Sequence, residues 1–267
     1  MPIVTLTSDY GEGSPHIAQL KGALLSRAPQ ATPVDVTHSV RKFDPLEAVF
    51  HLRQIAPEFP DETIHLMCVK VACNRPLRLV KYRRQYFLGA DNEAFGLLFD
   101  EGEPLLAFDL SAVRSERPLP TFPEREWFVP AAAHLANGGA PELLGRVAPP
   151  LQPGAWIPPR VETDALIGRV LYIDHYGNAV TNITREVFER VVGERSFLIP
   201  MRSTRMDFRK VHAHYDDVSI GDSVALFNAA GYLELAMNNQ SAPGGNGGAD
   251  ALLGLFRDQD VRIEFTS

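Results

Sequence analysis

Apolar, β-branched runs alternate with segments of helical spacing along the first half of the chain. Ser14-Pro15 and Asp44-Pro45 each place a capping side chain before a proline, which suits the first turn of a helix. The predicted helices cover residues 14–28, 44–59 and 127–137, and the predicted strands cover residues 3–11, 33–40, 63–71 and, as a hairpin or two short strands, 77–92. Strands separated by helices of this length predict an α/β domain with a largely parallel sheet flanked by helices.

The pattern changes after residue 146. Residues 147–162 contain five prolines and show no helical period, which is typical of a connection between domains. Short β-like runs punctuated by turn residues follow, over residues 167–183, 194–200, 222–237 and 260–265. We therefore predict an N-terminal α/β domain over 1–146, a Pro-rich linker over 147–163 and an all-β, barrel-like domain over 164–267.

Composition and charge narrow the classes of function. The 267 residues are 45% hydrophobic and 22% charged, as in ordinary globular proteins. A net charge of −7 argues against nucleic-acid binding, because no excess of Lys and Arg is available to replace counterions. No apolar run is long enough to span a bilayer, and the first residues lack the pattern of a signal peptide, so we expect a cytoplasmic protein. Cys68 and Cys73 are not expected to form a bridge, and no Cys/His set has the spacing of a zinc site.

One charged residue interrupts the most apolar of the predicted strands. Residues 64–75 read IHLMCVKVACNR, with Lys70 in the middle of the run. A structural ammonium group in a buried strand is costly unless it is paired. A catalytic lysine at this position would need partners elsewhere in the chain.

Two polar clusters at predicted strand ends are candidate sites, and each has a simpler alternative. Asp9 ends the first strand at the sheet edge where ligands bind in α/β folds, and it either holds hydroxyl groups of a sugar or caps the following turn. Asp174 and Asn178 lie in IDHYGNAVTNI, which either faces a ligand or forms a hairpin whose polar side chains satisfy the local backbone. His38 is more simply a hydrogen-bonded structural histidine than a general base.

Several strings in this order resemble the family of S-adenosylmethionine (SAM) hydroxide adenosyltransferases and their halogenase relatives, the chlorinases and fluorinases. The resemblance covers nearly the whole chain. Its landmarks are TLTSDYG with LKG, VDVTHSV with DPLEAVF, FPDETIHL, Asp91-Asn92, TFPERE, PAAAHLANG, IDHYGNAVTNI, NAAGYLELAMN and LLGL.

The resemblance implies an N-terminal α/β domain, a C-terminal β-barrel and a homotrimer. The nucleoside site is then expected between one subunit's N-terminal domain and a neighbour's C-terminal domain. Asp9 matches the aspartate that holds the ribose hydroxyls, and Phe43 matches an aromatic residue lining the ribose and methionine region. The ligand-facing positions in the second half are Asp174, Asn178, Tyr215 stacked on adenine, and Asn238 at the adenine edge.

The reaction that the resemblance implies is displacement of methionine from C5′ of SAM, with no cofactor beyond SAM as substrate or ligand. Water or hydroxide gives adenosine, and a halide gives a 5′-halogenated adenosine. The hydroxide-using members carry an Asp–Arg–His set to position water. Those positions here hold Lys70, Leu77 next to Arg78, and Pro123, while Glu124 replaces a halide-contacting serine of the fluorinases. An anionic Glu124 repels a halide.

Two hypotheses follow from these departures. In the first, the protein is an enzyme in which Lys70, Arg78 and Glu124 orient water or another nucleophile, with Lys70 paired to Glu124. In the second, the protein binds the nucleoside or SAM without catalysis, and a Lys70–Glu124 ion pair fills the position of the nucleophile.

Overall fold

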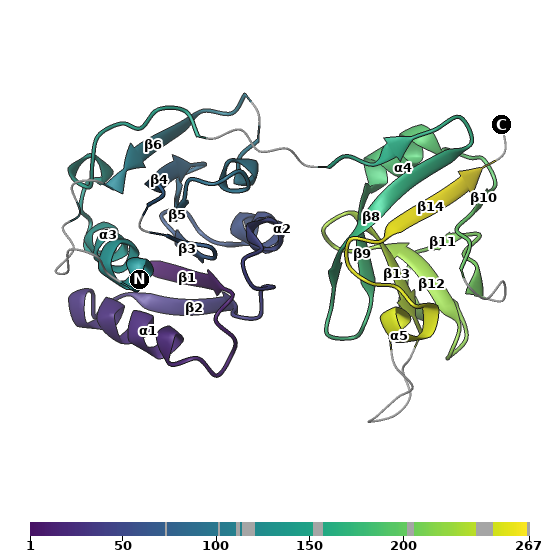
Figure 1. Ribbon diagram of the computed structural model, residues 1–267, viewed down its shortest axis with the longest axis horizontal. Helices are drawn as coiled ribbons and strands as arrows, with labels where there is room; N and C mark the ends of the chain where they lie inside the picture. The colour runs from purple at the N-terminus through teal and green to yellow at the C-terminus, as the bar shows by residue number, and fades with distance from the viewer. Residues whose placement is uncertain are drawn as a thin grey trace. The chain divides into compact units, whose positions relative to one another are not determined.

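The computed structural model of the chain divides into two compact units, residues 1–156 and 157–267 (Figure 1). It describes residues 1–72, 74–100, 102–110, 113, 121–151, 157–201, 206–238 and 248–265. Cys73 and parts of the predicted linker and of the glycine-rich segment near residue 245 lie outside these ranges. The predicted domain boundaries at 146 and 163 stay a prediction.

The first unit is built on a six-stranded sheet in the order β2-β1-β3-β5-β4-β6. β1 pairs in parallel with β2 and β3, β3 pairs in parallel with β5, and β4 runs antiparallel between β5 and β6. The strands are β1 (Ile3–Ser8), β2 (Thr32–Thr37), β3 (Ile64–Cys68), β4 (Leu77–Tyr82), β5 (Gln85–Ala90) and β6 (Leu105–Asp109). All strands except β4 therefore end at the same edge of the sheet, which we call the carboxyl edge.

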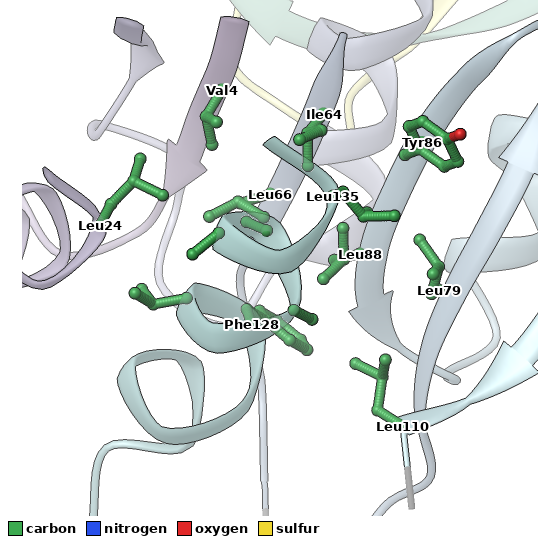
Figure 2. Close-up of a cluster of buried hydrophobic side chains, with 14 of the residues drawn as sticks. Val4, Leu24, Ile64, Leu66, Leu79, Tyr86, Leu88, Leu110, Phe128 and Leu135 are labelled. Carbon is green, nitrogen blue, oxygen red and sulfur yellow. The ribbon is translucent and has the colours of Figure 1, made fainter. Parts of the chain in front are cut away.

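Helices cover the sheet and enclose two hydrophobic cores. One core contains Leu24, Leu66, Leu88 and Phe128 (Figure 2), and the other contains residues of α2 and η2 such as Phe95. The predicted caps are confirmed, since Ser14 accepts a hydrogen bond from the N–H of His16 and Asp44 from those of Leu46 and Glu47. The helical elements are α1 (Pro15–Arg27), α2 (Pro45–Ile55), η1 (Ala56–Glu58), η2 (Phe95–Leu98), the π-helix η4 (Glu124–Phe128), α3 (Val129–Ala136) and η5 (Pro141–Leu143).

The second unit is a curled, largely antiparallel sheet of eight strands that forms a half-barrel (Figure 1). Its strand order is β10-β14-β8-β9-β13-β12-β11, with β7 paired to β8, and only the pair β11–β12 is parallel. The strands are β7 (Arg160–Val161), β8 (Ala165–Ile173), β9 (Ala179–Thr184), β10 (Phe197–Leu198), β11 (Val211–His212), β12 (Ser223–Phe227), β13 (Tyr232–Met237) and β14 (Asp260–Phe265). The predicted fold class, α/β followed by a barrel-like β domain, is confirmed.

Two details differ from the sequence-based prediction. The strand expected over 63–71 ends at Cys68, and Lys70 lies beyond it in a bend with a left-handed backbone (φ 52°). The β domain also contains three short helical elements that were not predicted: α4 (Arg185–Val191), η7 (Tyr215–Asp217) and α5 (Ala249–Leu253). Thr184 caps α4 by accepting a hydrogen bond from the N–H of Val187, a signal present in the sequence.

Candidate functional site

Asp9 lies at the carboxyl edge, directly after β1. Its Oδ2 accepts a hydrogen bond of 2.7 Å from the backbone N–H of Phe43, in the loop that joins β2 to α2. Phe43 has a left-handed backbone (φ 61°) and its side chain is 71% exposed. Such a conformation costs about 1 kcal/mol in a residue with a side chain, and it tends to be retained at ligand sites. Among the described residues the other oxygen of Asp9 accepts no hydrogen bond, so it can bind a hydroxyl group of a ligand.

A buried cluster of weak acids lies beside Asp9. Tyr10 and Cys68 follow or end neighbouring strands, and Glu124 is the first residue of the π-helix. Glu124 is only 5% exposed, and its burial and the negative charge of Asp9 raise the pKa of its carboxyl, while the Tyr10 hydroxyl opposes that rise. Burial and the nearby Glu124 and Asp9 also raise the pKa of the Cys68 thiol.

Aromatic contacts fix the position of this cluster. The Tyr10 ring packs edge-on against Phe122 at a centroid distance of 5.9 Å and lies 5.5 Å from the ring of His16 at the start of α1. Phe122 in turn packs edge-on against His16 at 4.8 Å. These contacts hold the segment before the π-helix against the end of β1. Neither Tyr10 nor His16 was a candidate from the sequence, although Tyr10 directly follows Asp9.

Lys70 does not lie in the buried cluster. Its side chain is exposed after the end of β3. In the described part of the chain, no ion pair joins Lys70 to the buried Glu124. The ion pair considered from the sequence is therefore not formed in this structure, and Glu124 has no cationic partner among the described residues.

Arg78 reaches the same edge because β4 begins where its neighbours end. The guanidinium is buried between two carboxylates, with Nε 2.9 Å from Asp91 Oδ2 and Nη1 2.8 Å from Asp109 Oδ2. Asp91 and Asp109 follow or end β5 and β6. A guanidinium held in this way ties three strand ends together, which is a structural role and leaves little freedom to orient a nucleophile.

A hydrogen-bonded chain runs along the ends of β1 and β2. Ser8 Oγ lies 2.7 Å from Nδ1 of the buried His38, whose Nε2 lies 3.0 Å from Oδ1 of Asp35. Glu12 accepts hydrogen bonds from the backbone N–H of His38 at 3.2 Å and from Ser39 Oγ at 3.1 Å. His38 is thus the hydrogen-bonded structural histidine expected from the sequence.

In the second unit, Asp174 and Asn178 close the turn between β8 and β9. Asp174 Oδ1 accepts hydrogen bonds of 2.8 Å from the N–H groups of Tyr176 and Asn178, and Asn178 Nδ2 donates to Asp174 Oδ2 at 3.0 Å. The Asp174 side chain satisfies the local backbone, as the hairpin alternative required, and the Asn178 side chain bonds to Asp174. This arrangement also fixes the position of both side chains.

Tyr215 and a buried carboxylate form the second polar group of this unit. The Tyr215 hydroxyl donates a 2.6 Å hydrogen bond to Glu234 Oε1, and Asn228 donates to the other oxygen at 3.3 Å. Glu234 is 3% exposed, and burial raises the pKa of its carboxyl. Beside them lies a hollow of about 540 Å³. Its walls include His214, Tyr215, Asp216, Phe227 and Asn228.

Asn238 is the last of the site residues predicted in the second unit. Its Nδ2 donates a 2.7 Å hydrogen bond to the carbonyl of Val218, whereas its Oδ1 is buried and has no partner among the described residues. A buried amide oxygen without a donor is unusual and is available to a ligand. Glu234 was not a candidate from the sequence, because in YLELAM it reads only as the polar position of an alternating strand.

The described residues contain no group of three or more His, Cys, Asp or Glu side chains that could hold a metal ion. Within the same ranges, none of the helices is both long and apolar enough to cross a membrane.

Family models account for both halves of the chain. The model of the SAM hydroxide adenosyltransferase N-terminal domain matches residues 4–145, and that of the C-terminal domain matches residues 168–262. The chain belongs to the SAM hydroxide adenosyltransferase family.

Several relatives are similar to this chain over nearly their whole length. It is 33% identical to an (R)-S-adenosyl-L-methionine hydrolase of Thermus thermophilus, over 97% of this chain and 98% of the relative. It is 27% identical to a fluorinase of Actinoplanes sp., over 89% and 91% of the two chains. The crystal structure of an uncharacterized conserved protein from Thermotoga maritima superposes with a TM-score of 0.83 at 26% identity, covering 98% and 99%.

Proposed function

We propose that the protein hydrolyses SAM to adenosine and methionine. The observation that carries the proposal is the full-length similarity, at 33% identity, to an (R)-S-adenosyl-L-methionine hydrolase. The site supports it, since Asp9 has a free carboxylate oxygen at the carboxyl edge and Phe43 exposes an aromatic ring beside it. We assign the ribose hydroxyls to Asp9 and the region around the ribose and methionine to Phe43.

The second unit contributes the groups that are suited to bind the adenine ring of SAM. An aromatic ring at Tyr215 borders the hollow and is suited to stack on adenine, and the unpartnered Oδ1 of Asn238 is suited to accept a hydrogen bond from an exocyclic amino group. Asp174 and Asn178, fixed by their own turn, complete the proposed set.

The chemical step is a displacement in line with the breaking bond. The oxygen of water bonds to C5′ and one of its O–H bonds breaks, releasing a proton to a base or to solvent. The C5′–S bond breaks at the same time, and its electron pair stays on the sulfur of methionine. A sulfonium is already a good leaving group, so the protein has to align the water and remove other solvent from it. A halide is a poorer candidate for the nucleophile, because the buried Glu124 would repel an anion at close range.

The alternative is a member that binds SAM without reacting it. The changed positions Lys70 and Pro123 favour this alternative, because the hydroxide-using members are expected to carry an aspartate and a histidine there. This alternative also assumed that a Lys70–Glu124 ion pair fills the position of the nucleophile. The exposed side chain of Lys70 argues against that ion pair.

Incubation with SAM in H₂¹⁸O distinguishes the two functions. Hydrolysis releases methionine and adenosine with ¹⁸O at the 5′ oxygen, which mass spectrometry detects. Added chloride or fluoride should give no 5′-halogenated adenosine. Separate samples of the two sulfonium epimers test whether the (R) form is the substrate. Binding of SAM by calorimetry without any product would reject hydrolysis and support the binding protein.

We also propose a homotrimer, the assembly implied by the family resemblance. Light scattering coupled to size exclusion should then give three times the 29.5 kDa mass of one chain. The cytoplasmic location predicted from the sequence remains a proposal of the same kind, which fractionation of cells would test.

A further inference from the structure

Glu124 and Tyr10 form a buried pair next to Asp9 that the known features of the site do not explain. The Tyr10 hydroxyl is enclosed by protein and has no hydrogen-bond partner of ordinary geometry among the described residues. It interacts with the carboxyl of Glu124, which itself is 5% exposed and has no cationic partner in the described ranges. A buried carboxyl without a counter-charge is costly and needs a reason.

The fold holds this carboxyl at one place. Glu124 follows Pro123 and opens the π-helix, an element that occurs often at functional sites. Phe122, two residues before Glu124, packs against Tyr10 and His16 and anchors the start of this helix. The start of the π-helix, and with it the backbone of Glu124, is thus held in place before any ligand arrives.

Among the described residues, the titratable groups that act on the pKa of Glu124 are all weak acids. They are the Tyr10 hydroxyl, the Cys68 thiol and the Asp9 carboxylate. Burial and Asp9 raise the pKa of Glu124 above its ordinary range, which brings it closer to the operating pH of a general base. Lys70, which replaces the expected aspartate of the family, is exposed and not among these groups.

We propose, on the basis of the SAM hydrolysis proposed above, that Glu124 is the catalytic base and Tyr10 its positioning residue. Asp9 holds the ribose, and Glu124 lies on the same edge beside it. One O–H bond of the attacking water breaks as its oxygen bonds to C5′. The proton passes to Glu124, and the electron pair of the C5′–S bond stays on sulfur. Glu124 then returns the proton to solvent.

Tyr10 acts through Glu124 and not on the substrate. Its hydroxyl interacts with the Glu124 carboxyl and opposes the rise in the pKa of that carboxyl, so it favours the charged form that accepts the proton. Its ring contacts fix the direction from which the hydroxyl approaches. In the hydroxide-using members that this chain resembles, an aspartate and a histidine are expected to position the water. Lys70 and Pro123 occupy those two positions here, so Glu124 and Tyr10 would take over that role.

The test compares Glu124→Gln, Glu124→Asp and Tyr10→Phe with the wild type in steady-state kinetics from pH 5 to 9. Glu124→Gln should lower kcat by about 10²- to 10⁴-fold, remove the acidic limb of the pH profile, and leave the Kd of SAM within about threefold. Tyr10→Phe should move the acidic limb to higher pH, because Glu124 loses the donor that opposes its raised pKa. Glu124→Asp should recover part of kcat.

Two matched controls separate catalysis from folding. Glu126→Gln changes another buried glutamate of the same π-helix, which is paired with Arg125, and Tyr82→Phe removes a hydroxyl that donates to Asp100. Both should keep kcat within about threefold. Glu124→Gln should melt no lower than the wild type, because it removes an unpaired buried charge.

The possible failures are distinct. A wild type that hydrolyses SAM together with a Glu124→Gln variant of unchanged kcat overturns the assignment of the base alone. An unshifted acidic limb in Tyr10→Phe overturns the role of Tyr10. A wild type that releases no adenosine overturns the proposed function, and the assignment falls with it.

Discussion

Asp9 and Phe43 are joined by a 2.7 Å hydrogen bond from the backbone N–H of Phe43 to the Asp9 carboxylate. One carboxylate oxygen thereby holds the backbone of the β2–α2 loop at Phe43, and among the described residues the second oxygen accepts no hydrogen bond. The two tasks need two acceptor oxygens, and an amide side chain has only one.

Asp9→Asn is therefore expected to raise the KM for SAM by about 10- to 100-fold. This change corresponds to the free energy that a hydrogen bond to a charged group contributes to binding. Steady-state kinetics measures the change. Asp61→Asn, an exposed residue that precedes β3 at the other edge of the sheet, should leave KM unchanged. An unaltered KM in Asp9→Asn would contradict the assignment of the ribose to this residue.

A substitution at Arg78 distinguishes a structural role of this residue from a catalytic one. Arg78→Met removes the guanidinium from between the carboxylates of Asp91 and Asp109 and should lower the free energy of unfolding by about 3 kcal/mol. The exposed pair of Arg84 and Asp61 offers the control, since Arg84→Met should cost less than about 1 kcal/mol. Urea unfolding measures both variants. A loss of kcat without a loss of stability would instead assign Arg78 to catalysis.

His65 should make stability depend on pH. Its ring stacks on Phe87 at 4.7 Å, Nδ1 lies 2.8 Å from Thr5 Oγ1, and burial lowers its pKa to about 4. The unfolded chain binds a proton near pH 6.5 and the folded chain only near pH 4, so stability falls as the pH drops through this window, by roughly 3 kcal/mol in total.

Urea unfolding at several pH values measures this slope. His65→Gln should flatten it between pH 6.5 and 4, whereas His175→Gln, at an exposed turn position, should leave it intact. A slope that persists in His65→Gln would show that another group carries it.

Tyr215 and Glu234 should make stability depend on pH in the opposite direction to His65. Burial raises the pKa of Glu234 in the folded state, so its contribution to stability is largest at low pH and is lost as the pH rises through that pKa. Tyr215→Phe removes a donor to the charged form and should destabilise the protein by about 1 kcal/mol at pH 7 and by less at pH 4.5. Tyr176→Phe, 79% exposed, is the control. An equal loss at both pH values would contradict this mechanism.

Lys70 carries backbone strain that glycine relieves. Because its φ is 52°, Lys70→Gly should raise the free energy of unfolding by about 0.5 to 1 kcal/mol. Lys210→Gly, at an exposed lysine without a positive φ, should not stabilise the protein. Thermal melting distinguishes the two. If Lys70→Gly destabilises, the side chain makes a contribution that its exposure does not indicate.

Local signals in the sequence predicted much of the fold. Ser14 and Asp44 begin helices through contacts within three residues, so the sequence is sufficient to place them. The strand around Lys70 was predicted too long, because Val69 and Val71 continue its apolar pattern while the backbone turns at Lys70. Helix α4 was missed because it is short and lies between two strands.

The candidate site was less accessible to sequence reasoning. The pair of Tyr10 and Glu124 depends on the packing of the π-helix against the end of β1, and the residues are far apart in the chain. Asp91 and Asp109 meet Arg78 only because three strands end or begin together. Local sequence patterns cannot reveal contacts between residues so far apart in the chain, so the two carboxylate partners of the catalytic candidate Arg78 were not predicted.

The carboxylates at the carboxyl edge should also affect the release of the products. SAM carries a positive sulfonium, whereas adenosine is neutral and methionine has no net charge. In a chain whose net charge is −7, we expect Asp9, Glu12 and Glu124 to attract the substrate but not its products. Cleavage of the C5′–S bond removes the charge that favoured binding, so the reaction itself promotes product release, an effect that rising salt would weaken.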